Sequence, residues 1–285
     1  MHKSKIQKRS APSAGSYSES LRTLTKEVAS VGSADGNYVG KFRLVQKASK
    51  FAPDENEVSF LQRHVLQVYL IFVIQLFYTG MVSLYMYLHP ELLLKLLNIL
   101  LSAHGLVFLA LCFVLFILLI FAQGTDSLLL GMAATIGVTT AVGIVMGLVP
   151  IFYDRNLIFE ALVLTIIIYL GSALFGMLTR NNLTGWGTPL FGGLLALIAF
   201  GFFQHYYTNS LLNIVILVAD IIIFTLYSAY DNQMIKIRFL DKLRDGVPDS
   251  GKSWWLLAMS SSIDIYLDFI NLFLDILNLL GDDDD

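Results

Sequence analysis

Charged residues are scarce in this chain of 285 residues, at 14% of the sequence, where soluble domains carry about a quarter. Apolar residues make up 56%, and the mean hydropathy is +0.67. This composition excludes a soluble α/β enzyme and predicts a polytopic membrane protein. Because the chain has a single cysteine, Cys112, no disulfide framework can form within it.

The first 60 residues lack a sustained apolar run, so we expect no secretory signal peptide there, and the first membrane span must itself direct insertion. Their abundance of Ser, Ala, Gly, Lys and Arg predicts a disordered, basic cytoplasmic tail over 1–60. Residues 1–63 hold 11 Lys and Arg residues against 6 Asp and Glu residues. We favour a solvated tail whose charge sets topology over a regulatory arm that binds anionic lipid.

Seven apolar stretches follow the tail, and each is close to the ~20 residues that a helix needs to cross a bilayer. Backbone N–H groups in lipid need internal partners, so these stretches must be helices. The predicted fold class is an all-α integral membrane protein, with seven transmembrane helices over 61–281 and an acidic tail over 282–285. We place the stretches at about 65–88, 99–122, 127–149, 156–178, 185–205, 210–230 and 255–280.

Basic residues are nearly absent from one side of the predicted bundle. With the N-terminus in the cytoplasm, 17 of the 19 Lys and Arg residues are cytoplasmic, and the external loops hold only Lys95 and Arg155. Residues 231–254 are predicted to form a long, charged cytoplasmic loop. The asymmetry follows the positive-inside rule and predicts a cytoplasmic N-terminus. The host membrane stays open between endoplasmic reticulum, Golgi and plasma membrane.

The last apolar stretch, 255–280, contains three aspartates. From Asp264 onward its polar residues recur at steps of four and three, through Asp268, Asn271 and Asp275, which is the spacing of one helix face. A carboxylate near the bilayer centre costs roughly 2.5–3.5 kcal/mol on insertion scales, so this face is not expected to contact lipid. The stretch either crosses the membrane or re-enters it, and the sequence allows both.

The sixth stretch supplies the predicted partners of this polar face. Asp220 lies in its middle and Asp231 at its cytoplasmic end, and about 100° per residue brings both onto one side of a helix. No Lys or Arg lies inside any predicted span, which leaves His104 as the basic candidate. Carboxylates without cations are protonated, share a proton in pairs, or bind a cation such as Ca²⁺. We therefore favour an ion or proton pathway over simple helix-to-helix hydrogen bonds.

Two aspartate motifs stand in order near the end of the chain. YDNQMI at 230–235 is followed by a charged segment and then by SSIDIYLDFINLFLDIL at 261–277. These motifs resemble the signature of the Bax-inhibitor-like family (transmembrane Bax inhibitor motif proteins), and residues 125–147 and 152–179 are similar to its third and fourth spans. The resemblance covers about 65–280. It implies seven helices with the seventh central, a pH-sensitive Ca²⁺ leak across internal or bacterial membranes, and suppression of cell death.

The resemblance also implies roles for individual residues. The family's proton-sensing pair corresponds to Asp231 and Asp268, and Asp264 matches an acid found in some members. These three carboxylates are the candidate metal ligands. The predicted ion pathway includes Asp264, Asp275, Asp220 and Asn271. Some members place an Arg latch in the second span, and this chain has none there.

The function predicted from these features is a Ca²⁺ leak channel in which Asp231 and Asp268 share a proton when closed and separate on deprotonation. A Ca²⁺/H⁺ antiporter and a non-transporting interaction protein that regulates apoptosis stay open as alternatives. An intramembrane aspartyl protease is disfavoured, because the last stretch lacks Gly-x-Gly-Asp, and we expect no enzyme activity and no cofactor. The expected partners are the lipid bilayer, Ca²⁺ and protons, with cell-death regulatory proteins as a further class and no nucleic acid.

Overall fold

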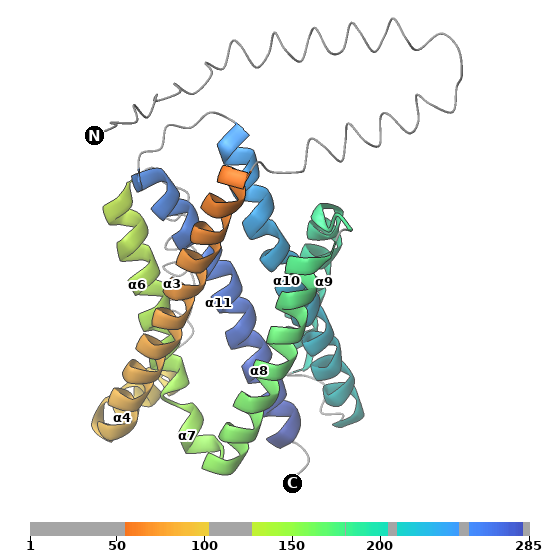
Figure 1. Cartoon of the computed structure of the whole chain (residues 1–285). Coiled ribbons are helices and arrows are strands. Elements are labelled where there is room, and N and C mark those ends of the chain that lie inside the picture. Colours follow the sequence, from red (N-terminus) through yellow and green to blue (C-terminus); the bar gives the residue numbers. More distant parts are fainter. Residues whose placement is uncertain (1–54, 103–126, 180, 205–209, 245–250, 282–285) are drawn as a thin grey trace, which may run out of the picture. The chain divides into compact units, whose positions relative to one another are not determined.

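The protein is described by a computed structural model, and the chain divides into two compact units, Met1–Phe60 and Leu61–Asp285. The contacts below all lie within the second unit. The structure describes residues 55–102, 127–179, 181–204, 210–244 and 251–281 (Figure 1). The predicted tail, most of the predicted second span, His104 and Cys112 lie outside these ranges.

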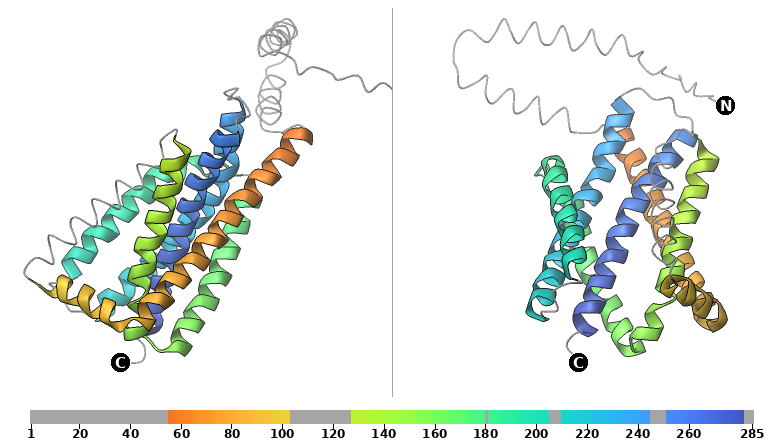
Figure 2. Two further views of the ribbon diagram at one scale, coloured as in Figure 1. Left: turned by 90° about the vertical axis from the view of Figure 1, so that its left-hand side faces the viewer. Right: turned by 180° about the vertical axis from the view of Figure 1, so that it is seen from behind.

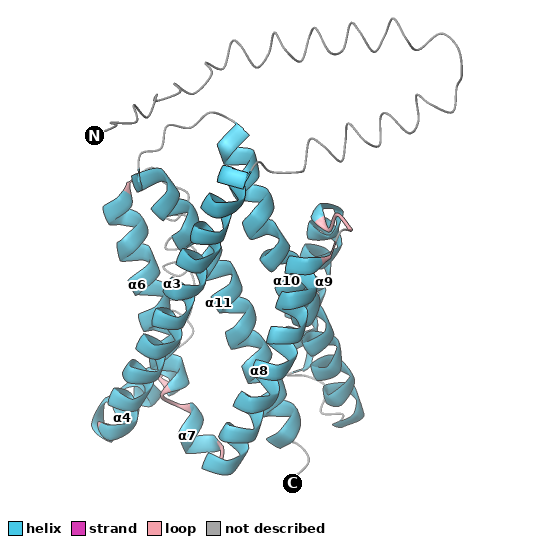
Figure 3. Ribbon diagram, viewed as in Figure 1, coloured by secondary structure: helices cyan, strands magenta, loops and turns pink. Residues whose placement is uncertain are grey.

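Every regular element in the described ranges is a helix, which confirms the all-α prediction there (Figure 3). The long helices are α3 (Glu55–Leu88), α6 (Leu128–Met146), α8 (Arg155–Leu178), α9 (Gly187–Gln204), α10 (Ser210–Arg244) and α11 (Gly251–Gly281). The short elements are α4 (Pro90–Leu101), α7 (Val149–Phe152) and η1 (Thr184–Trp186). Within the described ranges, four helical stretches are long and apolar enough to cross a membrane, which supports an integral membrane protein: Ser59–Leu88, Leu128–Phe152, Arg155–Leu178 and Leu212–Arg244.

The predicted cytoplasmic loop over 231–254 is wrong for most of its length. α10 continues as a helix to Arg244, and α11 begins at Gly251. The physical reason is amphipathic periodicity: Ile235 and Phe239 lie four residues apart on α10, and both are almost fully buried. Average hydropathy falls after Tyr230, so a window average does not detect the spacing of these two apolar residues. The charged residues that the prediction places in a loop therefore lie on a packed helix.

A second helix occupies a predicted connection, because α4 fills the region between the first two predicted spans. Pro90 lies in its first turn, where a missing N–H leaves no hydrogen bond unmade. Leu93 is buried, whereas Leu94 and Ile99 are exposed. α4 runs across the axis of α3 and not along it (Figure 2).

α11 packs against α10, α8 and α6, and it lies between α6 and α8 in both Figure 1 and Figure 2. Tyr266 and Leu272, which lie on different sides of α11, are both fully buried. α11 is therefore enclosed by its neighbouring helices for much of its circumference.

α8 and α10 approach each other closely at Gly176. A Cβ atom added there would lie 2.0 Å from the carbonyl oxygen of Ala229, so only glycine fits without a backbone shift. About one turn away, the hydroxyl oxygens of Ser172 and Ser228 lie 2.9 Å apart. This crossing fixes the register of α10 just before Asp231.

Side-chain contacts attach α3 to the other helices. The Tyr69 hydroxyl donates a 2.5 Å hydrogen bond to Oδ1 of Asn232 on α10. The hydroxyl oxygens of Thr79 and Tyr266 lie 2.6 Å apart, which joins α3 to α11. These contacts hold α3 beside the α10–α11 interface through long side chains.

Candidate functional site

Asp231 of α10 and Asp268 of α11 face each other, with their carboxyl groups within hydrogen-bonding distance. Asp268 is 5% exposed, and its Oδ2 atom has no conventional donor among the described residues. Two carboxyl groups share a hydrogen bond only when one of them holds a proton. If both were ionised about 4 Å apart, they would repel each other by roughly 4 kcal/mol at an effective dielectric constant of about 20. The pair is therefore stable with one proton and strained without it.

Asp264 has a basic partner, which corrects the prediction that no Lys or Arg lies among the membrane-embedded acids. The Nη1 atom of Arg238 on α10 donates to Oδ2 of Asp264 on α11 in an ion pair. The sequence prediction is wrong here because it places Arg238 in a loop, whereas α10 carries Arg238 about two turns beyond Asp231.

Asp275 of α11 and Asp220 of α10 form a third pair of acidic residues between the same two helices, close enough to influence each other electrostatically. Oδ2 of Asp275 is buried and has no hydrogen-bond partner in the described part of the chain, and the carboxyl group of Asp220 acts on Asp275 through space and not through a hydrogen bond. The helices run antiparallel, so three pairs of facing residues follow one another along their interface. We call them the acidic ladder: Arg238–Asp264, Asp231–Asp268 and Asp220–Asp275.

The remaining polar residues of the α11 stripe lie toward its C-terminal end. Asn271 is half-buried, about one turn after Asp268. Asn278 accepts a hydrogen bond from the hydroxyl of Tyr153, which precedes α8. The stripe therefore faces α10 for most of its length and the start of α8 at its end.

The predicted metal ligands are not gathered into one cluster in this conformation. No group of three or more His, Cys, Asp or Glu side chains within the described ranges is placed to hold a metal ion. Asp264 contacts Arg238 instead of joining Asp231 and Asp268. Because Ca²⁺ takes about 6–8 oxygen ligands, an ion at the pair alone would keep most of its water.

Sequence reasoning missed the polar shell around the carboxyl pair. Asn232, which is fully buried, accepts from Tyr69 and donates through Nδ2 to the carbonyl of Ser228 over 2.7 Å. The buried Tyr169 hydroxyl points toward Asn232 without making a hydrogen bond of ordinary geometry, and it lies near both aspartates. Asn232 sits within the recognised YDNQ motif, but no signal in the sequence marked Tyr69 or Tyr169.

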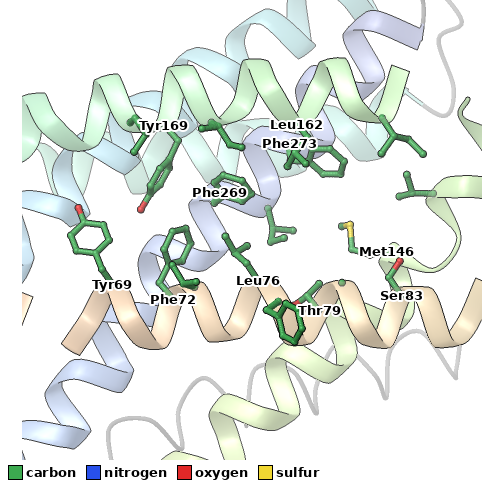
Figure 4. Close-up of a pocket in the computed structure, with 18 of the residues that line it drawn as sticks. Tyr69, Phe72, Leu76, Thr79, Ser83, Met146, Leu162, Tyr169, Phe269 and Phe273 are labelled. Carbon is green, nitrogen blue, oxygen red and sulfur yellow. The ribbon is translucent and has the colours of Figure 1, made fainter. Parts of the chain in front are cut away.

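An aromatic cluster joins three helices beside the pair. Phe72 of α3 stacks on Tyr169 of α8 with ring centroids 5.5 Å apart, and Phe269 of α11 meets both rings edge-on at 5.8 Å and 5.4 Å. These rings form one end of an apolar cavity of about 660 Å³ between α3, α8 and α11 (Figure 4). The hydroxyl oxygens of Tyr69 and Tyr169 lie near each other at that end. The cavity is therefore lined by neighbours of the pair, Tyr69, Tyr169 and Phe269, and not by Asp231 or Asp268 themselves.

A second aromatic cluster closes the end of the bundle that is predicted to be cytoplasmic. His64 is 1% exposed and packs on Phe239 and Trp254, with ring centroids 5.1 Å and 6.2 Å away. The ammonium of Lys242 lies 5.7 Å above the Trp254 ring and donates to the carbonyl of Ser253 over 2.7 Å. This cluster joins α3, α10 and α11 beyond the ladder.

Curated relatives cover about half of the chain. An uncharacterized membrane protein of Streptococcus pyogenes serotype M3 is 28% identical over 142 residues, which are 50% of this chain and 59% of that protein. An uncharacterized protein of Borreliella burgdorferi is 32% identical over 139 residues, 49% of this chain and 58% of the relative. The uncharacterized YrjE of Lactococcus lactis is 30% identical over 146 residues, 51% of this chain and 59% of the relative. The matches span about three fifths of these proteins.

The family comparison covers nearly all of the second unit. A sequence model described as inhibitor of apoptosis-promoting Bax1 matches residues 61–285. The match includes both aspartate motifs and every helix of the acidic ladder. The chain therefore belongs to the Bax-inhibitor-like family of membrane proteins.

Proposed function

We propose that this protein is a pH-sensitive leak pathway for Ca²⁺, controlled by the Asp231–Asp268 pair. The observation that carries the proposal is the carboxyl pair itself, at which Asp268 is buried against Asp231 with no Lys, Arg or His ion pair to either among the described residues. Such a pair can change its charge without unfolding the bundle. The test is Ca²⁺ flux into proteoliposomes against pH, for the wild type and for Asp268→Asn.

Proton loss provides the driving force for opening. At low pH, one proton bridges the carboxyl groups and holds α10 against α11. As pH rises the proton leaves, and a repulsion of roughly 4 kcal/mol replaces a hydrogen bond worth about 0.5–1.5 kcal/mol. The repulsion exceeds the lost attraction and separates the helices at the pair. Leak is therefore low at acidic pH and rises as the pair deprotonates.

The rest of the polar stripe supplies a route for the cation. In this proposal α11 is the central helix of seven. Between the pair and the opposite end of the bundle, the α10–α11 interface carries three further polar residues, namely Asn271, Asp275 and Asp220. Their oxygen atoms are the hard ligands that Ca²⁺ prefers. The proposal also includes Ca²⁺ as the transported ion and a link to cell-death regulators, both suggested by the family. The charge asymmetry supports a cytoplasmic N-terminus, and the proposed host membrane is that of the endoplasmic reticulum, the Golgi or the cell surface.

Asp275→Asn is expected to lower Ca²⁺ flux at high pH several-fold, because it removes a charged ligand from the route. The pH midpoint should stay close to that of the wild type, since the Asp231–Asp268 pair is intact. Flux against pH measures both quantities. Asp241→Asn, which removes an exposed carboxylate beyond the ladder on α10, is the matched control and should leave both unchanged. An unchanged flux in Asp275→Asn would remove Asp275 from the route.

A Ca²⁺/H⁺ antiporter would use the same carboxylates in a different cycle. An imposed pH gradient separates the two mechanisms, because only an antiporter moves Ca²⁺ uphill at the expense of protons. For the leak pathway, we expect Ca²⁺ to run down its own gradient at a rate set by pH, with no uphill accumulation. Uphill Ca²⁺ movement that stops when a protonophore removes the gradient would establish the antiporter instead.

A further inference from the structure

The Arg238–Asp264 ion pair lies at one end of the acidic ladder. Arg238 follows Asp231 by seven residues on α10, about 10 Å along the axis, and Asp264 precedes Asp268 by one turn on α11. Both side chains are 34% exposed, whereas Asp268 is buried. The ion pair therefore stands between the buried carboxyl pair and the polar medium at that end of the bundle.

The ion pair contributes little to stability. A partly exposed ion pair adds little stability, and the α10–α11 interface is already held by buried apolar residues such as Ile235, Phe239 and Ile265. A guanidinium at this position instead has an electrostatic consequence. Any cation that moves between the Asp231–Asp268 pair and this end of the bundle has to pass a fixed positive charge.

Among the described residues, Arg238 is the basic group that acts on the carboxyl pair. Arg238 acts on Asp231 through space, and Asp264 acts on both aspartates of the pair. The other described titratable neighbours of the pair are tyrosines, namely Tyr169 of α8 and Tyr227 and Tyr230 of α10, with Tyr69 of α3 beside Tyr169. The charge at this end of the route is thus set by Arg238 and by how far Asp264 neutralises it.

We propose that Arg238 is a selectivity-determining residue, a positive guard that raises the barrier for divalent cations more than for monovalent ones and is partly neutralised by Asp264. This inference rests on the proposed leak function and names a residue that regulates it. The barrier from a fixed charge scales with the charge of the ion, so Ca²⁺ experiences twice the repulsion that Na⁺ does.

The test compares two variants that break the same ion pair and change the charge in opposite directions. Arg238→Gln removes the guard and should raise Ca²⁺ flux about fivefold and Na⁺ flux about twofold, as expected for a unit charge about 8 Å away in water. Asp264→Asn leaves Arg238 without its neutralising partner and should lower the Ca²⁺-to-Na⁺ flux ratio. Both fluxes are measured on the full-length protein in liposomes at the pH of maximal leak.

Arg238→Lys and the double variant Arg238→Gln/Asp264→Asn complete the series. The lysine variant keeps the charge, so its Ca²⁺-to-Na⁺ ratio should stay near that of the wild type even if the fork geometry is lost. The double variant should have a higher ratio than Asp264→Asn alone. If Arg238→Gln does not fold, two other variants still test the proposal. The Ca²⁺-to-Na⁺ flux ratio should be unchanged in Arg238→Lys and lowered in Asp264→Asn.

Two outcomes would overturn the guard. If Arg238→Gln and Asp264→Asn change the flux ratio in the same direction, the ion pair acts as a mechanical tie between α10 and α11. If neither changes the ratio, Arg238 does not face the route. Failure of the proposed leak function is a separate result, since the wild type would then show no pH-dependent Ca²⁺ flux before any change at Arg238.

Discussion

Asp268→Asn is expected to hold Ca²⁺ flux at the low level of acidic pH across the whole pH range, at least about tenfold below the wild type at high pH. The asparagine amide is nearly isosteric with a protonated carboxyl group and donates permanently to Asp231. The repulsion of roughly 4 kcal/mol that separates the helices can then no longer arise. Asp231→Asn should give the same result from α10. The measurement is Ca²⁺ entry into proteoliposomes loaded with a calcium indicator.

The control for these variants is Glu160→Gln, which removes an exposed carboxylate on α8 and should keep the wild-type flux curve. The double variant Asp231→Asn/Asp268→Asn should resemble either single variant, because the two carboxyl groups act as one unit. If both single variants keep the pH dependence of the wild type, the assignment of the pair as the sensor is wrong.

Gly176→Ala is expected to destabilise the protein by about 2–3 kcal/mol or more, because the new Cβ atom would lie 2.0 Å from the carbonyl oxygen of Ala229. That atom belongs to the backbone, so relief requires α8 and α10 to separate. For a domain of this size, the loss corresponds to a fall in the thermal midpoint of roughly 5–10 °C. The midpoint can be followed in detergent by the loss of the monodisperse fraction on heating.

Gly171→Ala is the matched control on the same helix, because a Cβ atom at Gly171 would meet nothing within 4 Å. Its thermal midpoint should be unchanged or slightly raised, since alanine favours the helix over glycine. The separation of α8 from α10 in Gly176→Ala should also disturb the register of Asp231 and raise Ca²⁺ flux at acidic pH. Equal midpoints for the two variants would show that the close helix crossing does not limit stability.

Hydropathy was a good guide to the helices but a poor guide to where they end. The predicted stretches at 156–178 and 185–205 agree with α8 and α9 to within a few residues. The prediction ends the sixth stretch at 230, because averaging over a window treats Lys236 and Arg238 as the start of a loop. A helix that extends past the apolar part of a membrane keeps its buried face through Ile235 and Phe239, and only residue-by-residue periodicity shows this.

The candidate site was also predicted only in part. The spacing of Asp264, Asp268 and Asp275 was sufficient to predict one polar helix face, and the two motifs were sufficient to choose Asp231 as the partner of Asp268. The Arg238–Asp264 pair was missed because it follows from the extension of α10. The Tyr69–Asn232 contact joins residues 163 positions apart, so no local pattern could predict it.

The central claim, that Asp231 and Asp268 share one proton whose loss opens the leak, is tested most directly by infrared difference spectroscopy of the protein in lipid during a pH titration. We predict that a protonated-carboxyl C=O band disappears over the same pH range in which Ca²⁺ flux rises. The band should be absent from the difference spectra of Asp268→Asn. A band that stays constant through that range, or one that titrates unchanged in Asp268→Asn, would contradict the account.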